Sequence, residues 1–553
     1  MGIVILDRAR GSIKRLLYIG SKKQMEDVEL LVNGKTRGDR CVSFPPVVEL
    51  IDKVIDKHPD TTLEEALVSW RNEEYLRGGL ISEALYMPRL DIEGLRQYQN
   101  QAVNALMIAK KVVLGDDRGI GKTIEALATA EFLRESLQYA TFVICPAYLI
   151  DKWYKEAIKW TKYDVVKIQG TKQQKLQAIV DATAHGPKGL LLIMSYETTI
   201  THHYGDIYKI PRSILIVDEA HRLGNRKNKS VDDGDHNGVL NLAFKSEYTW
   251  LLTGTVVAET NPSKLWSLLH ILDPVTFSSY WWFIDRYCIT VEDAYGYTLF
   301  KGGKNTEELA SILNRYYIKR KREEVMEEIP VCEDIIYVEM SPLHKKLYNE
   351  LVKNSLCKMH SNVLLHNTVT TLRKFAQYPA AFGCEDKRPK SDVILKLVED
   401  CMIEGQKILI FGWHKDYLAT LYREINVNYA KSVMVNGDTP IILRTQVVDK
   451  FNEGEYEILL GTMGSIGEGL DIQIADVIIF AELHWNPCVV DQAISRVVRM
   501  GRQAPVAIYK VITRDTIEET ILEINEQKEK YIDEVNALLL LRRSLDKEAS
   551  DNV

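Results

Sequence analysis

Residues 115–123 read Gly-Asp-Asp-Arg-Gly-Ile-Gly-Lys-Thr, and these residue types are suited to binding phosphate. In a phosphate-binding loop, backbone N–H groups at the start of a helix surround the anion, while a lysine and a hydroxyl bind the phosphates and Mg²⁺. Lys122 and Thr123 complete the pattern G-x-x-x-x-G-K-[ST], but Asp116 stands in place of its first glycine. The candidate nucleotide-binding residues are Asp116, Asp117, Arg118, Gly119, Ile120, Gly121, Lys122 and Thr123.

The sequence on either side of this loop has the pattern that the chemistry needs. Residues 110–114 (KKVVL) form a short β-branched run, which is typical of a buried strand. Residues 123–133 (TIEALATAEFL) favour a helix with an apolar face. A strand, a turn with glycines and a helix are therefore predicted in that order.

Two adjacent acids complete a possible reaction site. Residues 213–221 (SILIVDEAH) form an apolar run that ends in Asp218 and Glu219. A buried strand would carry both carboxylates to its C-terminal end, where α/β proteins bind ligands. Asp218 can then hold Mg²⁺ while Glu219 orients or deprotonates the attacking water. These residues and the loop predict an enzyme that hydrolyses ATP with Mg²⁺.

Composition limits the other classes of function. A chain of 553 residues is long enough for two to four domains, and no apolar stretch approaches the roughly 18–20 residues of a membrane helix. Its eight cysteines include no C-x-x-C pair, which argues against a zinc module and a disulfide framework. The net charge is −7, so a nucleic-acid-binding surface would have to be a local patch.

Several blocks, taken in order, resemble the Snf2-type ATPases of helicase superfamily 2. They include the loop at 116–123, the Asp-Glu-Ala-His at 218–221, TWLLTGT at 249–255 and DQAISRVVRMGRQ at 491–503. An acid regularly replaces the first glycine of the loop in that family, so Asp116 fits the resemblance. FIDRYC (283–288) and FAELHWNP (480–487) favour the annealing-helicase-like branch.

The resemblance implies roles for further residues. Gln99 would recognise adenine, and Arg96 would bind the nucleotide nearby. Nucleotide contacts from the second lobe would come from Gly469, Asp471, Gln492, Arg496 and Arg499, with the two arginines as arginine fingers. Nucleic acid would be contacted by Ser195, Tyr196, Arg222, Arg226, Lys227, Thr255, Thr462 and Trp485. Two departures from the family pattern are Val256-Val257-Ala258-Glu259 after Thr255, and Arg502 between Gly501 and Gln503.

The expected fold is α/β, with two RecA-like lobes built on parallel sheets, helical insertions between them and a small N-terminal accessory region. Asn33-Gly34 predicts a hairpin turn in that region, followed by two short helices within 45–70. The expected divisions are 1–94 (accessory region), 95–275 (first lobe), 276–390 (helical protrusions and linker), 391–525 (second lobe) and 526–553 (C-terminal helix or tail).

The function expected from this resemblance is ATP-dependent translocation on double-stranded DNA, which remodels DNA structures or displaces bound proteins. Two alternatives stay open: a strand-separating DNA or RNA helicase, and an ATP-dependent DNA clamp with little turnover. The expected partners are double-stranded or forked DNA, with a possible protein partner at the N-terminal region and no membrane. The expected compartment is the cytoplasm in a bacterial or viral setting, or the nucleus in a eukaryote.

Overall fold

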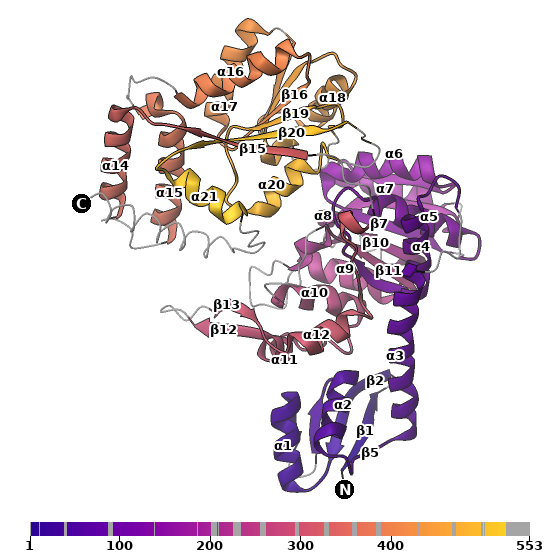
Figure 1. The fold of residues 1–553 in the computed structure, drawn as a ribbon. Helices are drawn as coiled ribbons and strands as arrows, with labels where there is room; N and C mark the ends of the chain where they lie inside the picture. Colours follow the sequence, from indigo (N-terminus) through magenta and orange to yellow (C-terminus); the bar gives the residue numbers. More distant parts are fainter. Residues whose placement is uncertain are drawn as a thin grey trace. The chain divides into compact units, whose positions relative to one another are not determined.

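The structure is a computed structural model that divides into two compact units, Met1–Val325 (unit 1) and Met326–Val553 (unit 2) (Figure 1). Each unit is described by itself. The described residues are 2–9, 12–37, 41–86, 92–137, 139–184, 186–200, 207, 209–224, 234–254, 262–292, 298–325, 331–356, 362–382, 389–429, 431–466, 472–498, 502 and 504–526.

Unit 1 begins with a five-stranded sheet of order β3-β4-β2-β1-β5. Its elements are β1 (Ile3–Ala9), β2 (Ser12–Ile19), α1 (Lys22–Val32), β3 (Lys35–Arg37), β4 (Cys41–Phe44), α2 (Val48–Lys57) and β5 (Thr62–Leu63). Ser21 caps α1, and Asn33 ends it with φ 46°, the left-handed conformation that terminates many helices. The hairpin turn predicted at Asn33-Gly34 is therefore a helix end, and the hairpin itself is β3–β4.

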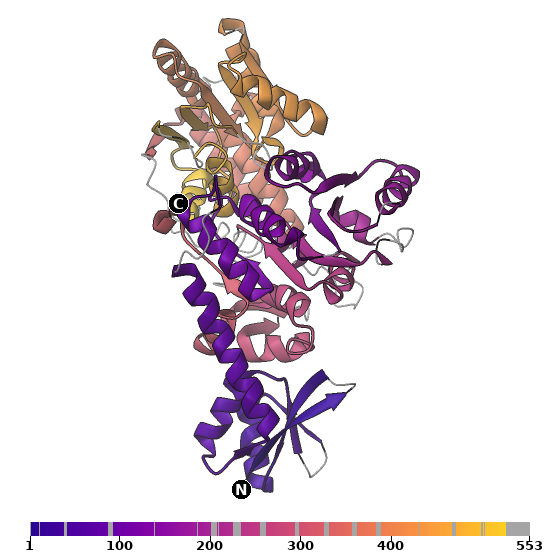
Figure 2. The same ribbon diagram turned by 90° about the vertical axis from the view of Figure 1, so that its right-hand side faces the viewer.

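One long helix, α3 (Glu65–Tyr86), stands where the sequence predicts a short one. It extends from the N-terminal sheet and packs on α4 (Gln97–Ala109) (Figures 1 and 2). The long helix α3 thus links the N-terminal sheet of unit 1 to α4.

The main sheet of unit 1 has seven parallel strands in the order β14-β6-β11-β10-β7-β9-β8. The strands are β6 (Lys111–Leu114), β7 (Ala140–Cys145), β8 (Asp164–Ile168), β9 (Leu190–Ser195), β10 (Arg212–Val217), β11 (Tyr248–Leu252) and β14 (Tyr317–Ile318). The helical segments are α5 (Lys122–Arg134), η1 (Ala147–Leu149), α6 (Ile150–Trp160), α7 (Lys172–Thr183), α8 (Tyr196–Ile200), η3 (Ala220–Gly224), α9 (Gly234–Phe244) and α10 (Ser263–Leu272).

Side chains of this sheet enter two different cores. Along β10, Leu215 and Val217 belong to one buried cluster, whereas Ile214 and Ile216 belong to another. Because successive residues of a strand point to opposite faces, both faces of the sheet are covered. This burial explains why the strand runs are apolar throughout.

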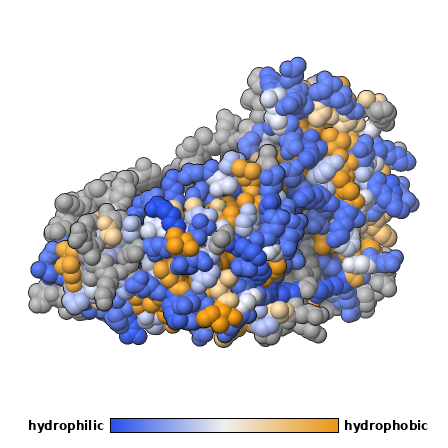
Figure 3. Space-filling view, turned by 90° about the horizontal axis from the view of Figure 1, so that it is seen from above, coloured by the Kyte–Doolittle hydropathy of each residue, from blue (hydrophilic) through white to orange (hydrophobic). Residues whose placement is uncertain are grey.

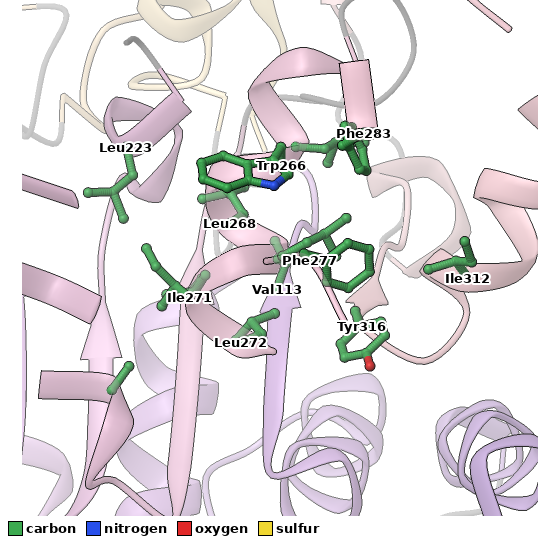
Figure 4. Close-up of a cluster of buried hydrophobic side chains, with 14 of the residues drawn as sticks. Val113, Leu223, Trp266, Leu268, Ile271, Leu272, Phe277, Phe283, Ile312 and Tyr316 are labelled. Carbon is green, nitrogen blue, oxygen red and sulfur yellow. The ribbon is translucent and has the colours of Figure 1, made fainter. Parts of the chain in front are cut away.

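The segment after α10, for which the sequence predicts helical protrusions and a linker over 276–390, contains strands as well as helices. It contains α11 (Tyr280–Tyr287), the antiparallel pair β12 (Cys288–Glu292) and β13 (Thr298–Gly303), α12 (Thr306–Leu313), the edge strand β14 and α13 (Arg322–Val325). β14 returns to the main sheet beside β6. Aromatic packing supports the return, because Phe277 and Tyr316 meet edge to face with ring centroids 5.7 Å apart (Figure 4).

Buried ion pairs connect the N-terminal elements to this segment. Glu308 accepts hydrogen bonds from Arg286 (2.6 and 2.7 Å) and from the Tyr287 hydroxyl (2.6 Å), and it pairs with Lys53 of α2. Arg315 donates to both carboxylate oxygens of Glu49, at 2.7 and 2.9 Å. Charges removed from water need such partners, so these pairs fix α2 against α12 and the residues that follow it.

Unit 2 contains a six-stranded parallel sheet of order β15-β20-β19-β16-β18-β17. Its strands are β15 (Val331–Val338), β16 (Ile408–Gly412), β17 (Ser432–Val435), β18 (Ile458–Thr462), β19 (Val477–Phe480) and β20 (Val506–Thr513). Its helical segments are α14 (Pro342–Leu356), α15 (Asn362–Gln377), η4 (Pro379–Phe382), α16 (Pro389–Ile403), α17 (Lys415–Asn428), α18 (Ile441–Asn452), α19 (Met463–Ile466), α20 (Pro487–Ile494) and α21 (Ile517–Glu526). The predicted α/β class with two parallel-sheet lobes is confirmed.

The surface seen in Figure 3 is mainly hydrophilic, with separate hydrophobic patches. Within the described part of the chain, no helix has both the length and the apolar character required to cross a membrane.

Replacing Glu308 with Gln tests the buried ion pairs of unit 1. Arg286 and Lys53 would lose their charged partner, and breaking a buried pair from one side costs about 3–5 kcal/mol. We expect a fall of this size in the free energy of unfolding, measured with urea. Glu247→Gln is the matched control, because its pair with Lys110 is half exposed and should contribute about 1 kcal/mol or less. Equal effects of the two changes would contradict the assignment.

Candidate ATP site

The phosphate-binding loop lies between β6 and α5, as the sequence predicts. Gly119 and Gly121 have φ values of 82° and 104°, a region that side chains with a Cβ rarely adopt. Two groups of α4 hold the loop from one side, since the Tyr98 hydroxyl (2.8 Å) and the Gln99 amide (3.4 Å) both donate to the Ile120 carbonyl. The glycines thus supply the backbone conformation, and α4 fixes it.

The Lys122 ammonium group is held over the loop. Its Nζ donates to the carbonyl oxygens of Asp116 (2.6 Å) and Asp117 (2.9 Å). Burial lowers the pKa of Lys122, while the neighbouring carboxylate of Asp116 raises it. The side chain is therefore placed by the same backbone segment that forms the first half of the loop.

Gln99 and Arg96 differ in their surroundings. Gln99 is buried, and its side-chain oxygen accepts a hydrogen bond from the Arg96 backbone N–H (3.0 Å). Arg96 is exposed. The Gln99 amide therefore links the start of α4 to the loop, which is a second role beside the expected one at adenine.

The loop pattern does not predict where the Asp116 side chain lies. Its side chain is fully buried and accepts hydrogen bonds from the backbone N–H (2.8 Å) and Nε (3.0 Å) of Arg320. The Asp116 side chain is thus enclosed within unit 1 and paired with Arg320, and its expected contact with nucleotide stays a prediction. The acid in place of the first glycine pairs with a remote arginine.

The two acids at the end of β10 occupy the same edge of the sheet as the loop. The Asp218 carboxylate accepts from Trp153 Nε1 (2.8 Å) and from the Glu219 backbone N–H (2.9 Å). Burial, followed by the nearby charge of Glu219, raises the pKa of Asp218 to about 6. Glu219 has φ 51°, a left-handed conformation that is uncommon for a residue with a side chain and often marks functional positions.

A short chain of contacts connects Glu219 to the next strand. His221 Nδ1 lies 3.2 Å from Glu219 Oε2 and 3.5 Å from the Thr253 hydroxyl. Thr253 follows β11, the strand between β6 and β10, and its N–H donates to the carbonyl of Leu114 at the end of β6. The carboxyl ends of β6, β11 and β10 are thus joined directly by side-chain and backbone contacts.

Two of the expected nucleic-acid contacts are buried. Tyr196 is fully buried, and its hydroxyl donates to the Asp218 carbonyl (2.7 Å). Ser195 is 5% exposed and lies 3.2 Å from the Thr198 hydroxyl, measured between their oxygens. Tyr196 therefore supports the end of β10 from inside unit 1, and contacts of Ser195 and Tyr196 with nucleic acid stay a prediction.

Arg222 remains a candidate for a phosphate contact. Its guanidinium group lies over the Tyr196 ring (5.0 Å) and 3.7 Å from Glu197, with about a third of the side chain exposed. Arg226, Lys227 and Thr255 lie outside the described residues.

In unit 2, Thr462 ends β18 and Trp485 follows β19, so both lie at the carboxyl side of the sheet. The Thr462 hydroxyl ends β18 and lies 2.7 Å from the Ser465 hydroxyl. Gln492 and Trp485 are half-buried, whereas Arg496 is 7% exposed. Gln492 lies in α20, which ends at Ile494, and Arg496 follows the helix. Gly469, Asp471 and Arg499 lie outside the described residues.

A buried polar cluster lies beside Trp485. Glu482 accepts hydrogen bonds from the backbone N–H groups of Trp413 and His414 (both 2.8 Å), and lies 2.6 Å from His414 Nδ1. His484 accepts from the Asn486 backbone N–H (3.0 Å), and its ring lies 4.4 Å from that of Trp413. The cluster joins the turns that follow β16 and β19, the two central strands of the sheet.

The donor set at the edge of the unit 1 sheet suits ATP with Mg²⁺. Lys122 supplies a cation for phosphate, and the Thr123 hydroxyl and the Asp218 carboxylate are hard oxygen ligands of the kind that Mg²⁺ prefers. Protein sites usually give Mg²⁺ only one or two carboxylates and leave other positions to phosphate and water. These residues therefore fit the expected cofactor.

Three residues of this site are not among the site residues that the sequence predicts. Trp153 is 65 residues from Asp218, and Arg320 is 204 residues from Asp116. Glu125 resembles any helix carboxylate, yet it is fully buried and accepts from Arg320 Nη2 (2.8 Å). Contacts between such distant positions depend on the strand order.

The fold and the site together define a two-lobed α/β protein with a phosphate-binding loop and an acidic pair on its first parallel sheet. Comparison with family models gives a match to the SNF2-related domain over residues 98–381 and to the helicase conserved C-terminal domain over 389–501. The first match alone spans more than half of the chain. The chain therefore belongs to the SNF2-related family and carries its ATPase domains.

Relatives with curated names are similar at a moderate level. The ISWI chromatin-remodeling complex ATPase ISW1 of Saccharomyces cerevisiae is 28% identical over 466 residues, covering 78% of this chain and 40% of that protein. The SWI/SNF-related matrix-associated actin-dependent regulator of chromatin subfamily A-like protein 1 homolog of Caenorhabditis elegans is 27% identical, covering 82% of this chain and 64% of that protein. The chain spans about two fifths of the length of the first relatives it matches.

Among solved structures, the Sulfolobus solfataricus SWI2/SNF2 ATPase core in complex with dsDNA matches with 21% identity and a TM-score of 0.38. The match covers 84% of this chain and 98% of that one.

Replacing Trp153 with Phe tests the contact that holds Asp218. The ring is kept but the Nε1–H is lost, and a hydrogen bond to a charged group is worth about 1.5–3 kcal/mol. We expect turnover of ATP to fall roughly tenfold or more. Trp160→Phe, at the other end of α6, is the matched control and should keep wild-type turnover. Unchanged turnover in Trp153→Phe would show that Asp218 does not need this donor.

The buried polar cluster beside Trp485, which contains His484, predicts that the stability of unit 2 depends on pH. Burial and the nearby Arg373 lower the pKa of His484 to about 4, against about 6.5 in an unfolded chain. Between these values the unfolded chain binds a proton that the folded chain does not, so stability falls as the pH drops through this window. We expect His484→Gln to reduce the loss of urea-unfolding free energy between pH 7 and pH 5. An identical loss in both proteins would contradict the assignment.

Proposed function

We propose that this protein is a DNA-dependent ATPase that moves along double-stranded DNA and thereby remodels DNA structures or displaces bound proteins. The observation that carries the proposal is the convergence of Lys122, Asp218 and Glu219 at one sheet edge, in a chain with SNF2-related domains. Relatives with this domain are named as chromatin-remodeling ATPases, which supports a substrate that contains duplex DNA.

Each residue of the site has a role in this proposal. Lys122 binds the β- and γ-phosphates, and Thr123 with Asp218 holds Mg²⁺, which neutralises phosphate charge when bound. Glu219 orients the attacking water and accepts its proton. Gln492, Arg496 and Arg499 of unit 2 remain predicted nucleotide contacts, together with Gly469 and Asp471.

The contacts with DNA in this proposal are sequence-independent. The proposed contacts with the DNA backbone are Ser195, Tyr196, Arg222, Arg226, Lys227, Thr255, Thr462 and Trp485. Phosphate contacts position a protein without reading bases, which suits an enzyme that must act at every step along a duplex. Annealing or fork remodelling is the finer form of the proposal, supported by FIDRYC and FAELHWNP in the sequence.

The cellular setting follows from the substrate. The proposed compartment is the one that holds duplex DNA, which is the cytoplasm in a bacterial or viral setting and the nucleus in a eukaryote. The N-terminal sheet is the proposed site for a protein partner.

ATP hydrolysis should be measured without nucleic acid and then with duplex DNA, forked DNA, single-stranded DNA or RNA. We expect duplex or forked DNA to stimulate turnover most. Glu219→Gln should keep ATP binding but lose at least about a hundredfold in turnover, because the group that accepts the proton is gone. Lys122→Ala should lose both binding and turnover, whereas Lys172→Ala, an exposed lysine at the start of α7, should keep both.

Two results would replace the proposal. Stimulation by single strands or RNA alone would indicate a strand-separating helicase. ATP binding without stimulated turnover would indicate a DNA clamp that recruits partners.

A further inference from the structure

A segment remote in sequence runs alongside the first half of the phosphate-binding loop. The N–H groups of Val113, Gly115 and Asp117 donate to the carbonyls of Tyr316, Ile318 and Arg320, at 2.8, 2.8 and 3.1 Å. In return, the Arg322 N–H donates to the Asp117 carboxylate (3.1 Å). The pairing of β14 with β6 therefore continues beyond the sheet and into the loop itself.

The Arg320 guanidinium group contacts the loop itself and the two helices α4 and α5. It bonds to the Asp116 carboxylate through Nε and Nη2, to the Glu125 carboxylate of α5 through Nη2 (2.8 Å), and to the Tyr98 carbonyl of α4 through Nη1. Its side chain is 8% exposed, and those of Asp116 and Glu125 are fully buried. A planar group with five donors in a fixed arrangement can satisfy all three elements at once, which a lysine cannot do.

The same backbone groups place Lys122. The carbonyls that accept from Lys122 Nζ belong to Asp116 and Asp117, the two residues held by Arg320 and Arg322. A displacement of this pair would therefore move the ammonium group that the proposed function assigns to phosphate.

We propose that Arg320 is a positioning residue for the phosphate-binding loop. Through Asp116 it fixes the backbone that orients Lys122, so that ATP affinity depends on the segment by which the chain leaves unit 1, five residues before its end at Val325. The inference deepens the proposed function and rests on it. Arg320 itself touches neither phosphate nor water in this proposal.

The test compares Arg320→Lys with wild-type protein in two assays. The first measures the affinity for ATP with Mg²⁺ by equilibrium binding, and the second measures KM and kcat of duplex-stimulated hydrolysis. We expect the dissociation constant and KM to rise at least tenfold, with a smaller change in kcat, because the loop is misplaced while Asp218 and Glu219 are untouched.

Arg315→Lys is the matched control. Arg315 lies in the same segment, is equally buried and also pairs with a carboxylate, that of Glu49, but it does not contact the loop. It should lower stability and leave ATP affinity within about threefold of wild type. If Arg320→Lys fails to fold, Asp116→Asn removes the same pairing without a change in size and should give the same tenfold loss.

The ATP affinity of the double variant distinguishes the loss of this contact from general destabilisation. Arg320→Lys and Asp116→Asn disrupt one contact, so their combined effect on ATP affinity should be no larger than the greater single effect. Additive losses, or a folded Arg320→Lys that binds ATP within threefold of wild type, would overturn the inference alone. Wild-type protein that fails to bind ATP would overturn the proposed function and the inference with it.

Discussion

The buried charge of Asp116 is the constraint on which the site in unit 1 depends. A carboxylate without solvent is tolerated only when a cation and hydrogen-bond donors surround it, and here Arg320 supplies both. To reach Asp116, Arg320 must follow a strand laid against β6, which requires the intervening insertion to return to the sheet edge. The order of the sheet, the packing of α4 and α5 and the shape of the loop are therefore parts of one arrangement.

The parallel sheets determine where chemistry can occur. Strands buried on both faces carry apolar side chains along their length, so reactive groups are found where the strands end. In unit 1 the ends of β6, β11 and β10 bring together the loop, Thr253 and the acidic pair. In unit 2 the ends of β16 and β19 bring together Trp413, Glu482 and His484. The two units thus share a plan, although their polar clusters differ.

The sequence predicts those site residues whose positions follow from their neighbours along the chain. Lys122, Asp218 and Glu219 stand next to apolar runs, so their positions at strand ends follow from short-range patterns. Arg320 and Trp153 are absent from that prediction, because their partners are brought close only by strand order. The local sequence does not show that Tyr196 is buried, yet its ring is fully enclosed in the core next to Asp218. The two-residue strand β14 is too short for any periodic signal, and the length of α3 depends on its packing against α4.

The N-terminal sheet and helices share one continuous core with the segment that follows α10. Val4, Leu50 and Leu67 belong to the same buried cluster as Phe283 and Ile312, and Trp282 Nε1 donates to the Val32 carbonyl (3.1 Å). A shortened protein that starts at residue 95 would strip these aromatic rings of their cover and leave Arg315 without Glu49. The elements from β1 to α3 are thus part of the folded core of unit 1, and a shortened ATPase fragment of this chain has to keep them.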